Sequence, residues 1–160
     1  MWFFMNTCYV MSFITFLMLL LALLQSYFQF YIFHANHLTF IILTSMVYLF
    51  TETLVIFFFV GTGVSIKEYT RDHKLEPDFH KKSTAVKMQV YPPLLLNMLF
   101  MIILFIMVGA VDTRQIPSWL YKAFFWFCLG HFLYVKNIQN QCFRQNTENI
   151  LAMSGLKLGT

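Results

Sequence analysis

The chain has 160 residues, of which 59% are hydrophobic, 19% aromatic and 11% charged, and its formal net charge is +4. Soluble domains average about 25% charged residues, and a core of this size cannot bury so large an apolar excess. The composition therefore excludes an ordinary soluble domain and predicts an integral membrane protein. In a membrane protein the distribution of basic residues indicates how the chain is oriented in the membrane, and the net positive charge does not by itself indicate a nucleic-acid site. We therefore expect the lipid bilayer, and no nucleic acid, as a partner.

Four apolar segments are each long enough to cross a hydrocarbon core about 30 Å thick. In chain order they cover approximately residues 9–28, 38–60, 94–111 and 118–135. The connections after the first and third segments are short, which favours antiparallel neighbours. The predicted fold is all-α: a single transmembrane domain over residues 1–160, with four transmembrane helices arranged as two antiparallel hairpins.

Two basic segments lie outside the predicted spans. Residues 64–93 are expected to form a loop between the second and third spans, and residues 136–160 a C-terminal tail. The loop carries six of the eleven basic residues, namely Lys67, Arg71, Lys74, Lys81, Lys82 and Lys87. The tail adds Lys136, Arg144 and Lys157, whereas the opposite side has Arg114 and Lys122. The positive-inside rule therefore predicts that the loop and both termini are cytoplasmic.

The basic loop has two interpretations. It is either an ordinary solvated loop or a surface that binds anionic lipid or an acidic partner. The loop is expected to fold into short amphipathic pieces, one of them a helix that starts at Pro77, which would favour the second interpretation. Gly61 and Gly63 are expected to end the second span, and Pro92 and Pro93 to lie in the first turn of the third.

One acidic residue, Glu52, interrupts the second span. A charged residue at the centre of a membrane helix costs about 2.5–3.5 kcal/mol on insertion scales, so it needs partners. At 1.5 Å per residue, Glu52, Asn97, His131 and Thr15 all lie about 20 Å from the outer surface, one on each helix. Tyr48 shares the helical face of Glu52. The sequence therefore predicts a Glu52–His131 pair, supported by Asn97 and Tyr48.

This polar level allows several functions. It could hold the helices together, relay a proton, or bind a quinone carbonyl. A haem bound to His131 is disfavoured because the second imidazole that it needs is missing at that depth. His34 and His37 lie near the outer surface, where with Asp112 they are the remaining candidates for metal ligands. Two histidines in a connection are more often ordinary polar residues, so no metal and no cofactor are predicted.

The sequence contains no Gly-x-Ser-x-Gly or His-Glu-x-x-His motif, so we expect no catalytic activity of its own. Our first hypothesis is a small non-catalytic membrane subunit or accessory protein of a larger energy-converting complex, respiratory or transporting, with other membrane subunits as partners. The alternative is a self-sufficient proton-coupled carrier or quinone-handling protein that uses Glu52 and His131. The expected location is a bacterial inner membrane or an inner membrane of an organelle.

Overall fold

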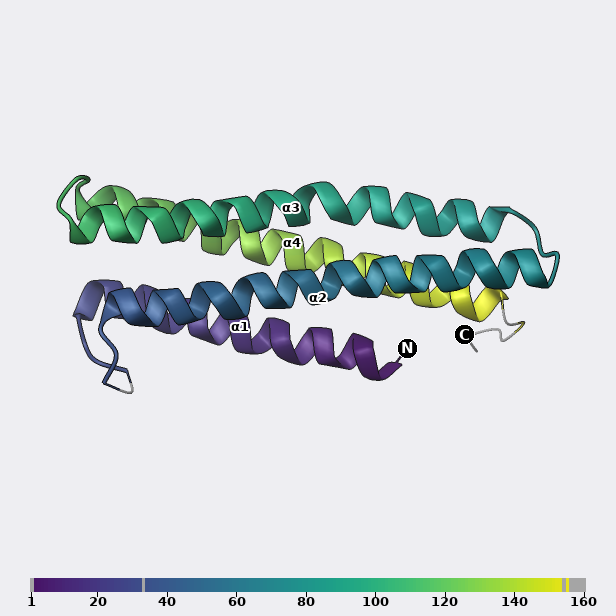
Figure 1. The fold of residues 1–160 in the computed structure, drawn as a ribbon, viewed down its shortest axis with the longest axis horizontal. Helices are drawn as coiled ribbons and strands as arrows, with labels where there is room; N and C mark the ends of the chain where they lie inside the picture. Colours follow the sequence, from purple (N-terminus) through teal and green to yellow (C-terminus); the bar gives the residue numbers. More distant parts are fainter. Residues whose placement is uncertain (1, 33, 154, 156–160) are drawn as a thin grey trace.

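A computed structural model describes residues 2–32, 34–153 and 155, and these form four long α-helices. The helices are α1 (Trp2–Phe28), α2 (His37–Asp72), α3 (Asp78–Asp112) and α4 (Ser118–Met153). Figure 1 shows that they lie lengthwise beside one another and that the chain reverses direction at each connection. The connections after α1 and α3 lie at one end of the bundle, which we call the two-turn end. The turn between α2 and α3 lies at the opposite end, which we call the charged end.

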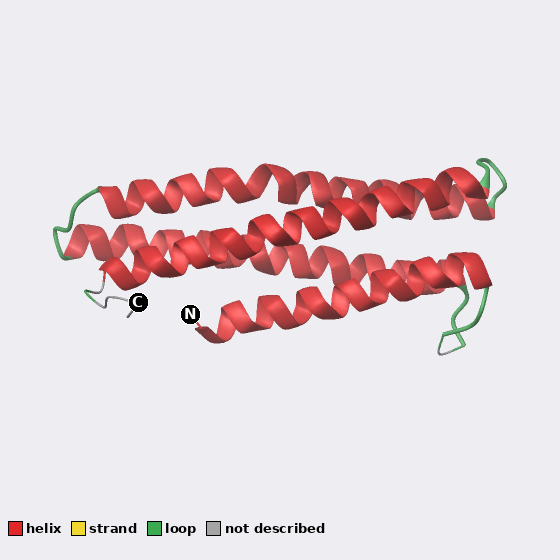
Figure 2. Cartoon of the chain, turned by 180° about the vertical axis from the view of Figure 1, so that it is seen from behind, coloured by secondary structure: helices red, strands yellow, loops and turns green. Residues whose placement is uncertain are grey.

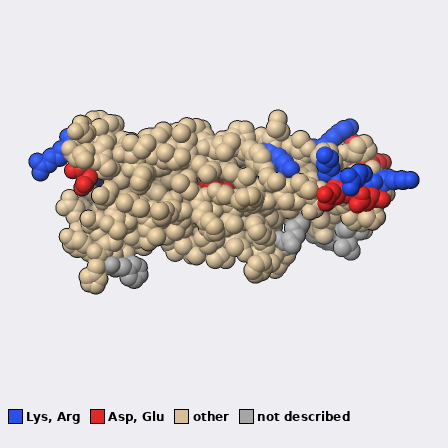
Figure 3. All heavy atoms as spheres, in the orientation of Figure 1, with Lys and Arg blue, Asp and Glu red and all other residues tan. Residues whose placement is uncertain are grey.

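Three helices of the described chain, α1, α2 and α3, are long and apolar enough to cross a membrane. This finding indicates an integral membrane protein. In Figure 3 the charged groups gather at the two ends of the molecule, and the surface between them consists almost entirely of uncharged residues. α4 is less apolar than the other three because Lys122, His131 and several Trp and Tyr residues lower the mean hydropathy of its first half.

The expected basic loop at residues 64–93 is almost entirely helical, and the helix expected from Pro77 is the first part of α3, whose N-cap is Pro77. α2 continues to Asp72 and α3 starts at Asp78, so only a short turn separates them. Gly61 therefore lies inside α2, and Pro92 inside α3. The sequence interpretation ended each span where its apolar run ended, whereas helices stabilised by packing against neighbours continue beyond the hydrocarbon core. The six basic residues are consequently carried mainly on helices.

The expected tail at residues 136–160 is also helical as far as Met153, and Lys157 lies outside the described residues. Its buried positions include Gln139, Cys142, Asn146 and Asn149. These positions alternate at spacings of three and four, the pattern that keeps one face of a helix against its neighbours. At the charged end, Asn149 Nδ2 donates a hydrogen bond of 2.9 Å to the carbonyl of Phe79 on α3.

The apolar interior consists of two clusters. The cluster nearer the two-turn end includes Leu19, Ile41, Leu104 and Phe125. The other includes Val55, Phe59, Val90 and Phe143 and lies nearer the charged end. Figure 2 shows that the N-terminus of α1 stops short of the charged end, which is therefore built from α2, α3 and α4. The buried polar residues described next lie between the two clusters.

Candidate functional site

Glu52 on α2 is completely buried, and its carboxylate is bound by three side chains. Asn97 Nδ2 donates to Oε1 over 3.1 Å, and Gln139 Nε2 donates to Oε2 over 2.7 Å. Lys136 Nζ forms an ion pair with Oε1 at 3.0 Å. Two helices, α3 and α4, therefore converge on one carboxylate of α2. A buried charge is tolerated when it is paired and hydrogen-bonded in this way.

Lys136 supplies the compensating positive charge from the margin of the bundle. Its side chain is 17% exposed, and Nζ also donates to Gln139 Oε1 over 2.9 Å. The ammonium lies 4.9 Å from the centre of the Phe132 ring, a cation–π distance. Lys136 and Gln139 also line a crevice of about 210 Å³ that has walls from α1 and α4. The lysine thus extends from the side of the bundle inward to Glu52.

The predicted direct pair between Glu52 and His131 is wrong. Within the described residues the two side chains share no hydrogen bond, and Asn97 lies between them. Its Nδ2 group donates to Glu52, and its Oδ1 atom accepts from His131 Nδ1 over 2.9 Å. An amide has one donor end and one acceptor end, so it can bridge a carboxylate and an imidazole that do not meet. This arrangement also assigns the imidazole proton to Nδ1 and leaves Nε2 as an acceptor.

Tyr48 and Thr15 lie close to the carboxylate without binding it. The Tyr48 hydroxyl donates to the backbone carbonyl of Asn97 over 3.4 Å, so it contacts the bridging residue through its main chain. Thr15 on α1 shares a hydrogen bond of 2.8 Å with Thr51 on α2. The structure therefore places all five predicted residues in the interior or at its edge. Glu52, Asn97 and His131 belong to one connected network, and the Thr15–Thr51 contact joins α1 to α2.

His131 is turned partly outward, in contrast to Glu52. Its ring packs between Phe100 of α3 and Phe127 and Tyr134 of α4, with ring centres 4.8, 6.4 and 6.1 Å away. Phe127 is 54% exposed and Tyr134 is 60% exposed. No side chain of the described residues forms a hydrogen bond with His131 Nε2. We call the surface formed by Phe100, Phe127, His131 and Tyr134 the aromatic face.

Comparison with known proteins does not extend these observations. No family model, curated protein or solved structure matches the chain. Its function must therefore be argued from its own geometry.

Two members of the network, Lys136 and Gln139, were missed from the sequence. Both lie just after the fourth predicted span, where a lysine looks like the start of a polar tail. The signal that could have found them is the run of inward positions Phe132, Val135, Gln139 and Cys142, which continues without interruption past Lys136. A heptad-like run of this kind predicts that the helix and its buried face continue.

The six basic residues of the expected loop lie on the last part of α2, on the turn after it and on the first part of α3. Figure 3 shows that most of the Lys and Arg side chains in view gather toward this end of the bundle. Acidic residues lie among them. Arg71 pairs with Asp72 at 3.1 Å, and Lys81 pairs with Asp78 at 3.4 Å. On α4, Arg144 pairs with Glu148 at 2.8 Å. These exposed pairs contribute little to stability, and they reduce the positive charge that the end presents to an anionic surface.

The two candidate metal ligands do not come together as a metal site. His34 is exposed in the connection, with a φ of 63°. His37 Nε2 lies 2.9 Å from the Tyr121 hydroxyl. Among the described residues no group of three His, Cys, Asp or Glu side chains could hold a metal ion. Asp112 nevertheless lines the same cavity as His37.

Proposed function

We propose that the chain is a small non-catalytic membrane subunit or accessory protein that packs on another membrane-embedded protein through the aromatic face. One observation carries this proposal, namely the outward orientation of His131. Its Nε2 acceptor has no hydrogen-bond partner among the described residues. His131 lies nine residues beyond Lys122, or about 13.5 Å along α4, and therefore inside the predicted fourth span. An unpaired polar atom at that depth is unfavourable in lipid, and a helix that presents an O–H or N–H group would satisfy it.

The sealed environment of Glu52 supports the same proposal. The carboxylate is fully buried and has three partners, so its bonds are already made without a substrate. A satisfied buried network of this kind fixes the relative positions of α2, α3 and α4. Its role is then structural, and recognition takes place on the outside of the bundle. The proposal requires α4 to cross the membrane with the other helices, because α4 carries His131 of the aromatic face and Lys136 of the Glu52 network.

The test is purification from native membranes in a mild detergent, with the variant Phe127→Ala/Tyr134→Ala. Both side chains are exposed, and neither belongs to the Glu52 network. We expect the wild-type chain to migrate in a larger assembly and the double variant to migrate alone. The control is Phe13→Ala, an equally exposed residue of α1. A wild-type chain that migrates alone at 19.0 kDa would contradict the proposal.

One observation favours the alternative function, a proton-coupled carrier. Hydrogen bonds connect Lys136, Glu52, Asn97 and His131 in an unbroken series across the bundle. However, the link between Glu52 and His131 is an amide, which does not gain and lose protons as a carboxylate or an imidazole does. Proton flux into liposomes tests this alternative. Flux that is abolished in Glu52→Gln and His131→Ala would establish it, whereas equal flux in all three proteins would exclude it.

Three finer expectations belong to the same proposal. The charged end lies in the cytoplasm, as the positive-inside rule predicts, and the lysines there that have no ion pair among the described residues offer a second contact with a partner or with anionic lipid. The host membrane is a bacterial inner membrane or an organelle inner membrane. Membership of an energy-converting complex and the absence of a cofactor stay predictions from the sequence.

A further inference from the structure

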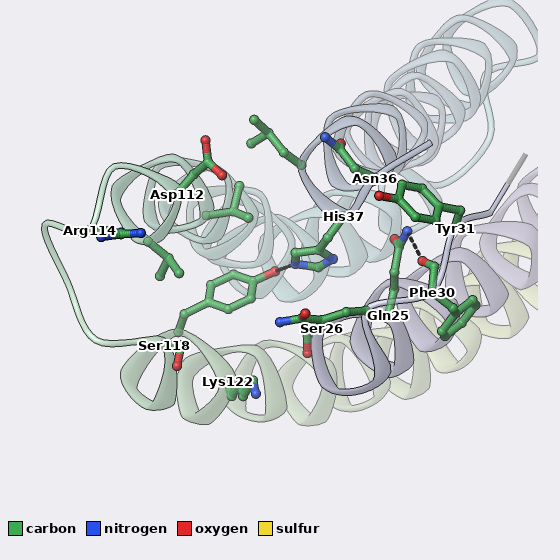
Figure 4. Close-up of a pocket in the computed structure, with 15 residues that line it drawn as sticks. Gln25, Ser26, Phe30, Tyr31, Asn36, His37, Asp112, Arg114, Ser118 and Lys122 are labelled. Carbon is green, nitrogen blue, oxygen red and sulfur yellow. Dashed lines mark hydrogen bonds between the residues drawn. The ribbon is translucent and has the colours of Figure 1, made fainter. Parts of the chain in front are cut away.

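A polar cavity of the described chain lies away from Glu52, at the two-turn end. It has a volume of about 440 Å³ and has walls from all four helices and from the connections between them (Figure 4). Small-molecule sites commonly have about 300–1,000 Å³ and combine apolar walls with a few placed polar groups. Leu38, Val108 and Val111 provide apolar wall here. We call this space the terminal cavity.

Gln25 presents an unused acceptor to the terminal cavity. The residue is completely buried, and its Nε2 group donates to two main-chain carbonyls, those of Phe30 at 2.8 Å and Ala35 at 3.1 Å. Turning the amide over would place its oxygen against these carbonyls, so the orientation is fixed. Oε1 is buried and has no partner among the described residues. A buried acceptor held in this way is costly unless something donates to it.

His37 presents a second unused group. The Tyr121 hydroxyl, 2.9 Å from Nε2, has no other partner in the described chain, so it donates its proton to that nitrogen. With the hydroxyl as donor, the imidazole proton lies on Nδ1, which is also buried and has no partner among the described residues. The opposite assignment would leave the hydroxyl proton and the Nδ1 lone pair both unused. Figure 4 shows the side chains of Gln25 and His37 reaching into the same cavity.

The rim of the terminal cavity carries both signs of charge. Asp112 and Arg114 both line it, yet neither side chain has an ion pair within the described residues. Lys122 lines it as well, with Nζ 4.6 Å from the centre of the Tyr27 ring. The cavity thus offers one unused acceptor and one unused donor in its interior, and one carboxylate and two cations among the other residues that line it. A ligand of matching chemistry has an ammonium group and a carboxylate close together, and an apolar side chain.

We propose that the terminal cavity binds a small zwitterion of the α-amino acid class. The ammonium group donates to Gln25 Oε1 and faces Asp112, and the carboxylate accepts from His37 Nδ1 and faces Lys122 and Arg114. A bound metal fits less well, because no group of three His, Cys, Asp or Glu side chains among the described residues could hold one. Water alone is the competing occupant, since it too could bond Gln25 and His37. This site is independent of the aromatic face and of the function proposed above.

The experiment is calorimetric titration of the purified protein in detergent with L-leucine, whose side chain suits the apolar wall. L-Leucinamide, which lacks the carboxylate, and N-acetyl-L-leucine, which lacks the ammonium group, are the matched probes. We expect saturable binding of L-leucine and at least about tenfold weaker binding of both analogues, because each loses charge-assisted hydrogen bonds. No saturable binding of L-leucine, or equal binding of all three compounds, would overturn the proposal and leave water as the occupant.

A surface variant separates recognition from folding. Asp112→Asn changes an exposed side chain and should weaken binding of L-leucine by about tenfold. Binding of N-acetyl-L-leucine should be unchanged, since that compound has no ammonium group to face residue 112. Asp78→Asn, at the charged end, is the control and should bind L-leucine like the wild type. Equal affinity of the Asp112→Asn variant and the wild type for L-leucine would contradict the assigned orientation.

Discussion

Replacement of Lys136 by Met provides the sharpest test of the buried network. Methionine has a similar length and no charge, so the change removes the ion pair of 3.0 Å and leaves the carboxylate of Glu52 fully buried. Removing one member of a buried pair costs about 3–5 kcal/mol, because the remaining charge is uncompensated. Asn97 and Gln139 still donate to Glu52 in the variant, which favours the lower part of this range.

The reverse change, Glu52→Gln, should cost less, about 1.5–3 kcal/mol for the lost charged hydrogen bonds. The difference arises from burial, because Lys136 is 17% exposed and can turn its ammonium group outward, whereas Glu52 has no access to the surface. The double variant should therefore be more stable than the sum of the two single changes predicts. A coupling free energy of about 1–3 kcal/mol is expected between contacting residues of one network.

The assay is unfolding in mixed micelles of mild detergent and sodium dodecyl sulfate, followed by near-ultraviolet circular dichroism. Lys67→Met is the matched control, since Lys67 is exposed near the end of α2, and its free energy of unfolding should change by less than about 0.5 kcal/mol. If Lys136→Met lowered the free energy of unfolding by no more than this control does, the ion pair would contribute as little to stability as an exposed surface pair. The assignment of Lys136 as the partner of Glu52 would then be refuted.

Three further changes test other contacts by the same unfolding assay. Asn97→Leu removes the bridge between carboxylate and imidazole and should cost about 1–3 kcal/mol; a neutral result would mean that the bridge carries no stability. Thr51→Val removes the bond to Thr15 and should cost about 0.6 kcal/mol more than Thr53→Val, whose hydroxyl bonds only within its own helix; equal costs would contradict the α1–α2 contact. Gly61→Ala should stabilise α2 by up to about 1 kcal/mol, because an added methyl group there meets open space, and a loss of stability would argue against this.

Much of the interior could be predicted from the sequence, because burial in a membrane depends on quantities that are read directly from it. The apolar runs gave the four helices, and the rise per residue brought Glu52, Asn97 and His131 to one depth. Depth alone does not decide which side chains touch. A change of one residue in register rotates a side chain by about 100°, which is enough to exchange a direct Glu52–His131 contact for one bridged by Asn97.

The missing partner of Glu52 shows why charge is an unreliable marker of a span end. Lys136 looked like the first residue of a polar tail, since lysine rarely lies inside a membrane. Its four-carbon stem lets it lie at the margin of the bundle while its ammonium group reaches inward. The expected bounds of α2 and α3 were also too narrow, because the glycines were expected to end the second span and the prolines to begin the third. These residues interrupt isolated helices, but in this bundle neighbouring helices hold them in place.

The length of the helices has a mechanical consequence. α2 has 36 residues and is therefore about 54 Å long, which exceeds a hydrocarbon core of about 30 Å by roughly 24 Å. In the proposed orientation the excess forms a helical extension at the charged end, which we call the stalk. In α3 the stalk contains Pro92 and Pro93, which lack amide protons, so the helix bends more easily there than elsewhere. Asn97 lies about one turn further along. A force that bends α3 at these prolines would therefore act next to Asn97, the residue whose amide connects Glu52 to His131.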